Sequence, residues 1–146
     1  MAKICVYIGD NYPEINKDLL VTAAICHDIG KVDELSDFPE NDYTDQGQLI
    51  GHIVLGTMMV DNKIREIKDF PVVLANELKH CILAHHGELE YGSPKKPALI
   101  EAVALAHADN MDAKLQTFIQ VLKDNKDNSG WLGYNKMFES NVRITE

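Results

Sequence analysis

The sequence predicts an all-α fold, a helical bundle of about five main helices. Apolar residues recur at helical spacing through most of the chain, prolines and glycines separate these stretches, and no segment has a convincing strand pattern. A chain of 146 residues, 45% of them hydrophobic and 25% charged, has the size and composition of one globular domain. We therefore expect a single domain over residues 1–146, in which 124–146 form a loosely packed or interfacial tail.

The second expected helix has clear signals at both ends. Asn16 or Asp18 caps its first turn. It ends at His27-Asp28, where Gly30 is expected to take a left-handed conformation that closes the last turn. The carbonyl groups at this helix end carry partial negative charge, which favours a cation nearby.

The other expected helices are placed by the same kinds of signal. The first covers residues 2–9 and lacks a capping residue, the third begins at Thr44 or Asp45 and reaches Ile64 with His52 in its first half, the fourth covers Val72 to His86, and the fifth runs from Pro97 to about Lys123. A polar loop through Pro39 separates the second helix from the third. Helical spacing assigns Ile25 to the core and puts Leu49 and Met58 on the apolar face of the third helix.

The composition restricts the compartment and the partners. No run reaches the roughly 18 apolar residues of a membrane span, and no signal sequence is visible, so we expect a cytoplasmic protein with no membrane partner. Cys5, Cys26 and Cys81 lack metal-type spacing and are expected to be reduced, buried residues. The net charge of −9 argues against a protein that coats nucleic acid through positive charge, although bound metal ions can create a local positive potential.

Nitrogen and oxygen donors are concentrated at helix ends and on facing helices. They are His27 and Asp28 at the end of the second helix, His52 on the third, His85 and His86 at the end of the fourth, and Asp109 in the fifth. The stretch around Asp109 is too apolar to accept an unpaired carboxylate. Facing donors commonly build a metal site in a helical bundle, and imidazole with carboxylate suits divalent transition metals. Taken alone, a His-Asp pair is more often a carboxylate that orients a buried histidine.

Four motifs, in this order, resemble the HD superfamily of metal-dependent phosphohydrolases. They are His-Asp-Ile-Gly-Lys at 27–31, Gly-His at 51–52, His-His-Gly at 85–87 and Ala-Asp-Asn-Met-Asp-Ala-Lys at 108–114. Within this superfamily, Glu-Leu-Glu-Tyr-Gly-Ser-Pro at 88–94 and the Asp-Asn-x-Asp-Ala-Lys ending are similar to the HD domain of YhaM-type 3′-to-5′ exoribonucleases. The resemblance covers roughly residues 1–120 and implies an HD-domain helical bundle.

The resemblance also implies a role for each motif residue. His27, Asp28 and Asp109 would bind a first metal ion, and His52, His85 and His86 would bind a second. Asp28 would bridge the two ions and, with Lys31 beside a substrate phosphate, would be catalytic. The cofactor would be one or two divalent ions of Mn, Fe, Zn, Ni or Mg, because two such ions can clamp the attacking and leaving oxygens of a phosphoryl transfer.

The chain departs from this family pattern in two ways. The family's metal site begins with one more histidine on the first helix, and here no histidine precedes His27. We expect that this ligand belongs upstream of Met1 in a chain that starts late, and that its loss weakens the first metal site. The exoribonucleases also carry an RNA-binding OB domain ahead of the HD domain, which does not fit within these 146 residues.

Three residues near the motifs are candidates for supporting the metal ligands. His80 lies on a different helix face from His85, so it either supports the ligands or is structural. His107 is expected to support the site or simply to be buried. Asp112 either orients a ligand histidine or pairs with Lys114 on the surface.

Two further pairs are candidates for substrate binding. Lys95 and Lys96 either contact a phosphate backbone or are solvated in their loop. Trp131 and Tyr134 either stack on a base or pack against the bundle.

The favoured function is that of a metal-dependent phosphohydrolase acting on phosphodiester or phosphomonoester bonds. Its substrate would be a phosphate-containing small molecule, such as a nucleotide, or the 3′ end of a single-stranded RNA. The alternative is a metal-poor, inactive helical module that binds nucleotides or a protein partner. A homodimer is left open by the sequence.

Overall fold

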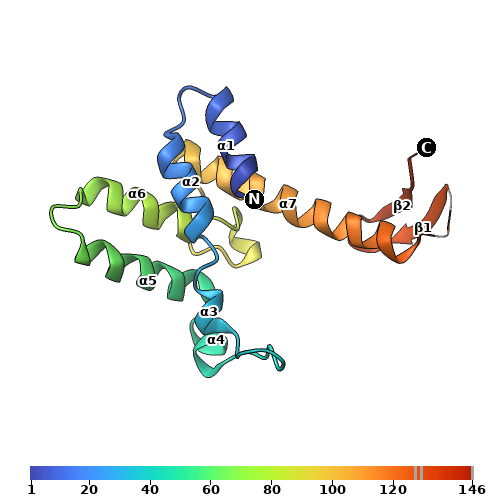
Figure 1. Ribbon diagram of the computed structural model, residues 1–146, viewed down its shortest axis with the longest axis horizontal. Coiled ribbons are helices and arrows are strands. Elements are labelled where there is room, and N and C mark those ends of the chain that lie inside the picture. Colours follow the sequence, from blue (N-terminus) through green and yellow to red (C-terminus); the bar gives the residue numbers. More distant parts are fainter. Residues whose placement is uncertain (127, 129, 146) are drawn as a thin grey trace. The chain divides into compact units, whose positions relative to one another are not determined.

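A computed structural model describes residues 1–126, 128 and 130–145 and confirms the all-α prediction (Figure 1). In chain order its elements are α1 Ala2–Asn11, α2 Lys17–Cys26, α3 Lys31–Glu34, α4 Asp45–Leu49, α5 His52–Glu66, α6 Val72–Leu83, the 3-10 helix η1 Leu89–Tyr91, α7 Ile100–Asp124, β1 Trp131–Asn135 and β2 Ser140–Arg143. The chain divides into two compact units, Met1–Asn110 and Met111–Glu146.

The first unit is a bundle built on helix pairs. Helices α1 and α2 pack together, α5 and α6 form an antiparallel hairpin, and α2 also contacts α6 (Figure 1). Small and branched apolar residues fill the core between them, which allows the helices to approach closely. The buried core cluster consists of Cys5, Ile15, Leu19, Leu20, Ala23, Ala24, Leu78, Cys81, Ile82, Ala84, Ala102, Leu105 and Ala108.

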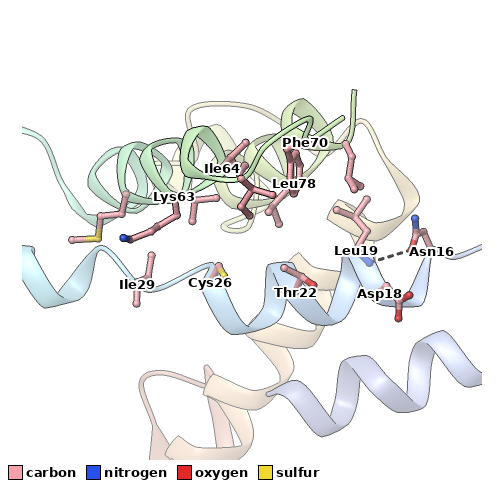
Figure 2. A pocket seen from close by; sticks show the side chains of 14 residues that line it. Asn16, Asp18, Leu19, Thr22, Cys26, Ile29, Lys63, Ile64, Phe70 and Leu78 are labelled. Carbon is pink, nitrogen blue, oxygen red and sulfur yellow. Dashed lines mark hydrogen bonds between the residues drawn. The ribbon is translucent and has the colours of Figure 1, made fainter. Parts of the chain in front are cut away.

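The start of α2 is fixed by two hydrogen bonds. The side-chain oxygen of Asn16 accepts a hydrogen bond from the backbone N–H of Leu19 at 3.1 Å, drawn as a dashed line in Figure 2, and this confirms Asn16 as the cap. The backbone N–H of Asn16 donates to the carboxylate of buried Glu101 at 2.7 Å. Glu101 thereby ties the first turn of α7 to the first turn of α2.

Three predicted helix boundaries were wrong. The third predicted helix is two helices, α4 and α5, because Gly51 has φ +78° and breaks the helical path between them. Helix α6 ends at Leu83, so the predicted last three residues form a turn instead. Helix α7 begins at Ile100, and Pro97 therefore lies outside it.

The predicted cap at Thr44 is confirmed, since its hydroxyl accepts a hydrogen bond from the backbone N–H of Gly47 at the start of α4. The predicted apolar faces, in contrast, are partly wrong. The side chains of Ile25, Leu49 and Met58 are exposed by 68%, 85% and 53%. Ile25 points away from the face of α2 that carries Leu20, and Leu49 belongs to a short helix outside the core cluster.

The second unit corrects the prediction that the chain contains no strands. β1 and β2 form an antiparallel hairpin, with Trp131 opposite Arg143 and an irregularity between Trp131 and Gly133. That irregularity and the positive φ of Gly133, +93°, break the alternation by which a strand is recognised in sequence. Within this unit, the rings of Phe118 and Phe138 lie 5.0 Å apart between their centroids.

Within the described part of the chain, none of the helices combines the length and the apolar composition needed to cross a membrane.

Candidate metal centre

The His27-Asp28 pair lies in the turn that joins α2 to α3. His27 follows Cys26 with helical φ and ψ of −55° and −36°, and its backbone N–H still bonds to the carbonyl of Ala23. Gly30 was predicted to adopt a left-handed conformation, and this was wrong, because its φ and ψ are −65° and −14°. Glycine is required here for space: a Cβ at this position would collide with the backbone carbonyl oxygen of His52.

The other histidines are placed by turns that depend on glycine. His52 is the first residue of α5, directly after Gly51. His85 and His86 follow α6 in a turn that ends at Gly87, whose φ is +80°. Each of these imidazoles therefore lies at an element end, where its direction is set by the local turn.

The first unit brings all six predicted metal ligands together. They are His27, Asp28, His52, His85, His86 and Asp109. We refer to these six residues as the histidine–aspartate cluster. Its members come from four segments that are widely separated in sequence, so the fold alone creates the cluster.

The carboxylate of Asp28 lies at the centre of the cluster. Its Oδ2 atom is 3.3 Å from Nε2 of His27, and its Oδ1 atom is 3.5 Å from Nε2 of His52 and 3.8 Å from Nε2 of His85. The Oδ1 atom of Asp109 is 3.5 Å from Nε2 of His27. One oxygen of Asp28 thus faces His27, and the other faces His52 and His85.

Three of the imidazoles are held by backbone carbonyls through Nδ1. Nδ1 donates to Ala24 at 2.9 Å in His27, to Ile82 at 2.7 Å in His85 and to Tyr91 at 2.8 Å in His86. Because a carbonyl oxygen can only accept, Nδ1 carries the hydrogen in each case. In the neutral form of each imidazole, Nε2 is therefore unprotonated and can bind a cation.

Two buried nitrogen atoms of the cluster lack a hydrogen-bond partner in the described structure. They are Nε2 of His52 and Nε2 of His85. One ligand nitrogen from each of His52, His85 and His86 lies within 4.8 Å of the others. A buried, unpartnered nitrogen is costly unless something satisfies it, and a shared cation would satisfy all three.

The charge states of the cluster also favour a cation. Burial lowers the pKa of His85 to about 4, so its imidazole is neutral at physiological pH. The contact with His27 holds the pKa of Asp109 below its usual value. Burial alone would raise the pKa of Asp28, but its contacts with His27 and Lys31 outweigh burial and lower it. Ionised carboxylates and neutral imidazoles are the donors that divalent transition metals use, so the cluster fits such an ion.

The carboxylates around His27 favour the protonated form of its imidazole. Burial alone would lower its pKa, but the contacts with the carboxylates of Asp109 and Asp28 outweigh burial and raise it to about 9. A metal ion at this side of the cluster would therefore compete with a proton on His27.

Lys31 lies beside the cluster, at the start of α3. Its ammonium group is 2.7 Å from Oδ2 of Asp28, and its side chain is 48% exposed. Lys31 thus adds a solvent-accessible positive charge next to the central carboxylate.

The candidates His80, Lys95 and Lys96 form contacts with residues outside the histidine–aspartate cluster. His80 accepts a hydrogen bond from the backbone N–H of Ala98 at 2.9 Å, which ties α6 to the segment before α7. Lys95 lines a surface hollow together with His80. Lys96 forms an ion pair with Glu88 at 2.6 Å. His80, Lys95 and Lys96 line the same hollow, and the described residues along it include none of the six cluster members.

The remaining candidates lie on α7 and on the hairpin. His107 is exposed on α7. Asp112 belongs to the second unit, one turn of α7 after Asp109. Trp131 and Tyr134 lie on β1 with side chains exposed by 69% and 68%.

Sequence reasoning missed Glu34. This residue ends α3, is only 7% exposed, and accepts a hydrogen bond from the His52 imidazole. The available signal was its position three residues after Lys31 on a short helix, which turns it toward the same side of the segment. A buried carboxylate cannot be recognised as such before the fold is known.

A separate apolar groove lies between α2 and the α5–α6 hairpin (Figure 2). Its volume is about 630 Å³, and Leu19 on α2 lies across it from Ile64 and Leu78 on the hairpin. The described residues that line this groove do not include a member of the histidine–aspartate cluster. The polar chemistry of the first unit is therefore concentrated elsewhere.

The helical bundle and its histidine–aspartate cluster define a class of protein. The chain belongs to the HD domain family, whose family model matches residues 1–114. This family consists of metal-dependent phosphohydrolases and nucleases, and its members bind divalent metals.

Curated relatives give a more particular likeness. The chain is similar to proteins named "3'-5' exoribonuclease YhaM" from Listeria monocytogenes serotype 4b, at 42% identity over 129 residues, and from Bacillus subtilis strain 168, at 40% identity over 124 residues. The first match covers 86% of this chain and 40% of the relative, and the second covers 84% and 39%. The chain thus spans about 40% of the length of these relatives. No solved structure matches the chain.

Proposed function

We propose that this chain is a catalytic HD domain that hydrolyses phosphodiester bonds at the 3′ end of single-stranded RNA. The observation that carries the proposal is the convergence of six donor residues, Asp28 among them, in one cluster, with buried Nε2 atoms of His52 and His85 that lack a partner in the described structure. The names of the curated relatives support RNA as the substrate class.

The donors would form two sets, and the carboxylate of Asp28 contacts a histidine of each. His27, Asp28 and Asp109 would hold one divalent ion, and His52, His85 and His86 would hold the other. Such ions supply Lewis-acid charge for phosphoryl chemistry. Lys31 would lie against a phosphate oxygen of the substrate and offset the negative charge that develops there.

A small hollow beside the cluster offers a place for the terminal base. It has a volume of about 200 Å³ and is lined by residues that include His52, His86, Tyr91 and Pro94. The ring of Tyr91 is 66% exposed and thus accessible to a stacked base. Stacking tolerates every base, so this arrangement fits exonucleolytic removal of successive nucleotides.

The test compares substrates and variants of the full chain. Purified protein is loaded with Mn²⁺ and incubated with 5′-labelled single-stranded RNA or with mononucleotides. We expect shortening of the RNA from its 3′ end, loss of this activity in Asp28→Ala, and retention in Asp33→Ala, which removes an exposed carboxylate from neighbouring α3.

Three outcomes would contradict the proposal. Turnover that survives Asp28→Ala would exclude the cluster as the active site. Cleavage of mononucleotides without cleavage of RNA would indicate a small-nucleotide phosphohydrolase. Elemental analysis that finds well under one equivalent of transition metal after loading would indicate an inactive binding module.

A further inference from the structure

One imidazole of the cluster is held differently from the others. His27, His85 and His86 each donate Nδ1–H to a neutral backbone carbonyl within five residues. Nδ1 of His52 instead lies 3.0 Å from Oε1 of Glu34, a carboxylate on a different helix. Among the four histidines of the cluster, His52 is therefore the one whose Nδ1 atom is held by a side chain.

Glu34 binds His52 at two points. Its Oε1 atom accepts from the backbone N–H of His52 at 2.9 Å and from the imidazole Nδ1 at 3.0 Å. The Glu34 side chain is 10% exposed and the His52 side chain 13%. Because the oxygen holds both the backbone and the ring, it fixes the ring's direction relative to the start of α5.

The segment that carries Glu34 is itself held closely. A Cβ on Gly30 would collide with the carbonyl oxygen of His52, and a Cβ on Gly47 would collide with that of Glu34. The carbonyl oxygen of Glu34 also accepts from the backbone N–H of Thr44 at 2.9 Å. These close approaches leave little freedom for the carboxylate to move away from His52.

We propose that Glu34 is a positioning residue for metal binding. It holds His52 in the tautomer with hydrogen on Nδ1, directs the unprotonated Nε2 toward Asp28, and strengthens Nε2 as a donor through its negative charge. A carboxylate behind a metal-binding imidazole commonly has this effect. This inference shares with the proposed function the assumption that His52 binds a metal ion, and it does not depend on the hydrolysis of RNA.

The test measures Mn²⁺ binding to the full chain by calorimetry. Glu34→Gln keeps an oxygen that can accept both hydrogen bonds but removes the charge. We expect its Mn²⁺ affinity to fall about 10- to 100-fold at one site. Asp33→Asn is the matched control, since it removes an exposed carboxylate one residue away on α3, and it should bind Mn²⁺ as the wild type does.

A second measurement separates positioning from a purely structural role. Nitrogen-15 NMR of the metal-free wild-type chain at mildly alkaline pH should show His52 with hydrogen on Nδ1. In Glu34→Ala, hydrogen should be distributed over both ring nitrogens of His52 while His85 is unchanged. The same measurement tests the inference if a Glu34 variant fails to fold, because the wild-type tautomer can be read alone.

Some results would overturn this inference and others would overturn the proposed function. Unchanged Mn²⁺ affinity in Glu34→Gln, or hydrogen on Nε2 of His52 in the wild type, would overturn the role of Glu34 even if RNA is hydrolysed. A chain that binds Mn²⁺ in a Glu34-dependent manner but hydrolyses nothing would support Glu34 and contradict the proposed function.

Discussion

The Nε2 atom of His27 lies 3.5 Å from the Oδ1 atom of Asp109, so the end of α2 is joined to the middle of α7 by an ion pair. The His27 side chain is 9% exposed. With a metal bound, Asp109 and His27 would both be ligands of the same ion. Without a metal, the carboxylate of Asp109 stabilises the protonated form of His27.

The first prediction concerns the pH dependence of stability in the chelator-treated chain. The folded pKa of His27, about 9, lies above the ordinary histidine value of 6.5. The protonated imidazole therefore contributes its full stabilisation below about pH 6.5 and loses it as the pH rises through about 9. Urea titrations should show the free energy of unfolding falling across this range. In His27→Gln the decrease should be absent; an equal decrease would show that another group is responsible.

The second prediction concerns Lys31. Lys31→Met removes the ammonium group 2.7 Å from Asp28 and should lower kcat for RNA on the order of 10²-fold, because charge on the phosphoryl oxygens is no longer offset. Mn²⁺ content should stay unchanged, since Lys31 is not among the donors. Lys63→Met, which breaks the exposed ion pair with Glu66, is the control and should leave kcat unaltered. Loss of metal together with activity would contradict this role.

The third prediction concerns Gly30. In Gly30→Ala the new Cβ must displace the carbonyl oxygen of His52, so the free energy of unfolding should fall by about 2 kcal/mol. Because His52 moves, Mn²⁺ affinity should fall as well. Gly130→Ala also introduces strain, at φ +72°, but its Cβ would point into open space in the second unit. It should leave Mn²⁺ affinity intact, and a similar loss in both variants would exclude a specific effect on His52.

The fourth prediction concerns Tyr91. If its exposed ring stacks on the terminal base, Tyr91→Ala should raise KM for single-stranded RNA about tenfold, within the range expected for one lost stacking contact. Tyr91→Phe keeps the aromatic face and should leave KM unchanged. Equal KM values for all three proteins, measured under the same salt conditions, would place the base elsewhere.

Much of the fold and the set of cluster residues followed from the sequence. The cap at Asn16 was visible because its side chain bonds locally, and the order of the His-Asp and His-His motifs identified the HD family. Both signals are local in the chain.

What the sequence did not provide depends on contacts between distant segments. Gly30 appeared to be a left-handed helix end, but its role is the close approach to the carbonyl of His52. Glu34 was not singled out from the sequence, because its burial comes from packing against the start of α5. Neither contact can be recognised until the two segments are brought together.

Gly51 offers no side chain to cap α5, so the first backbone N–H of that helix is satisfied by Glu34 from another segment. The same oxygen thereby anchors a helix terminus and orients an imidazole. Selection for a stable fold would preserve such a carboxylate even in a descendant that had abandoned hydrolysis. A glutamate at this position in a distant homologue would therefore indicate only that the fold is shared. Whether the homologue can still catalyse hydrolysis would have to be judged from the six residues of the histidine–aspartate cluster.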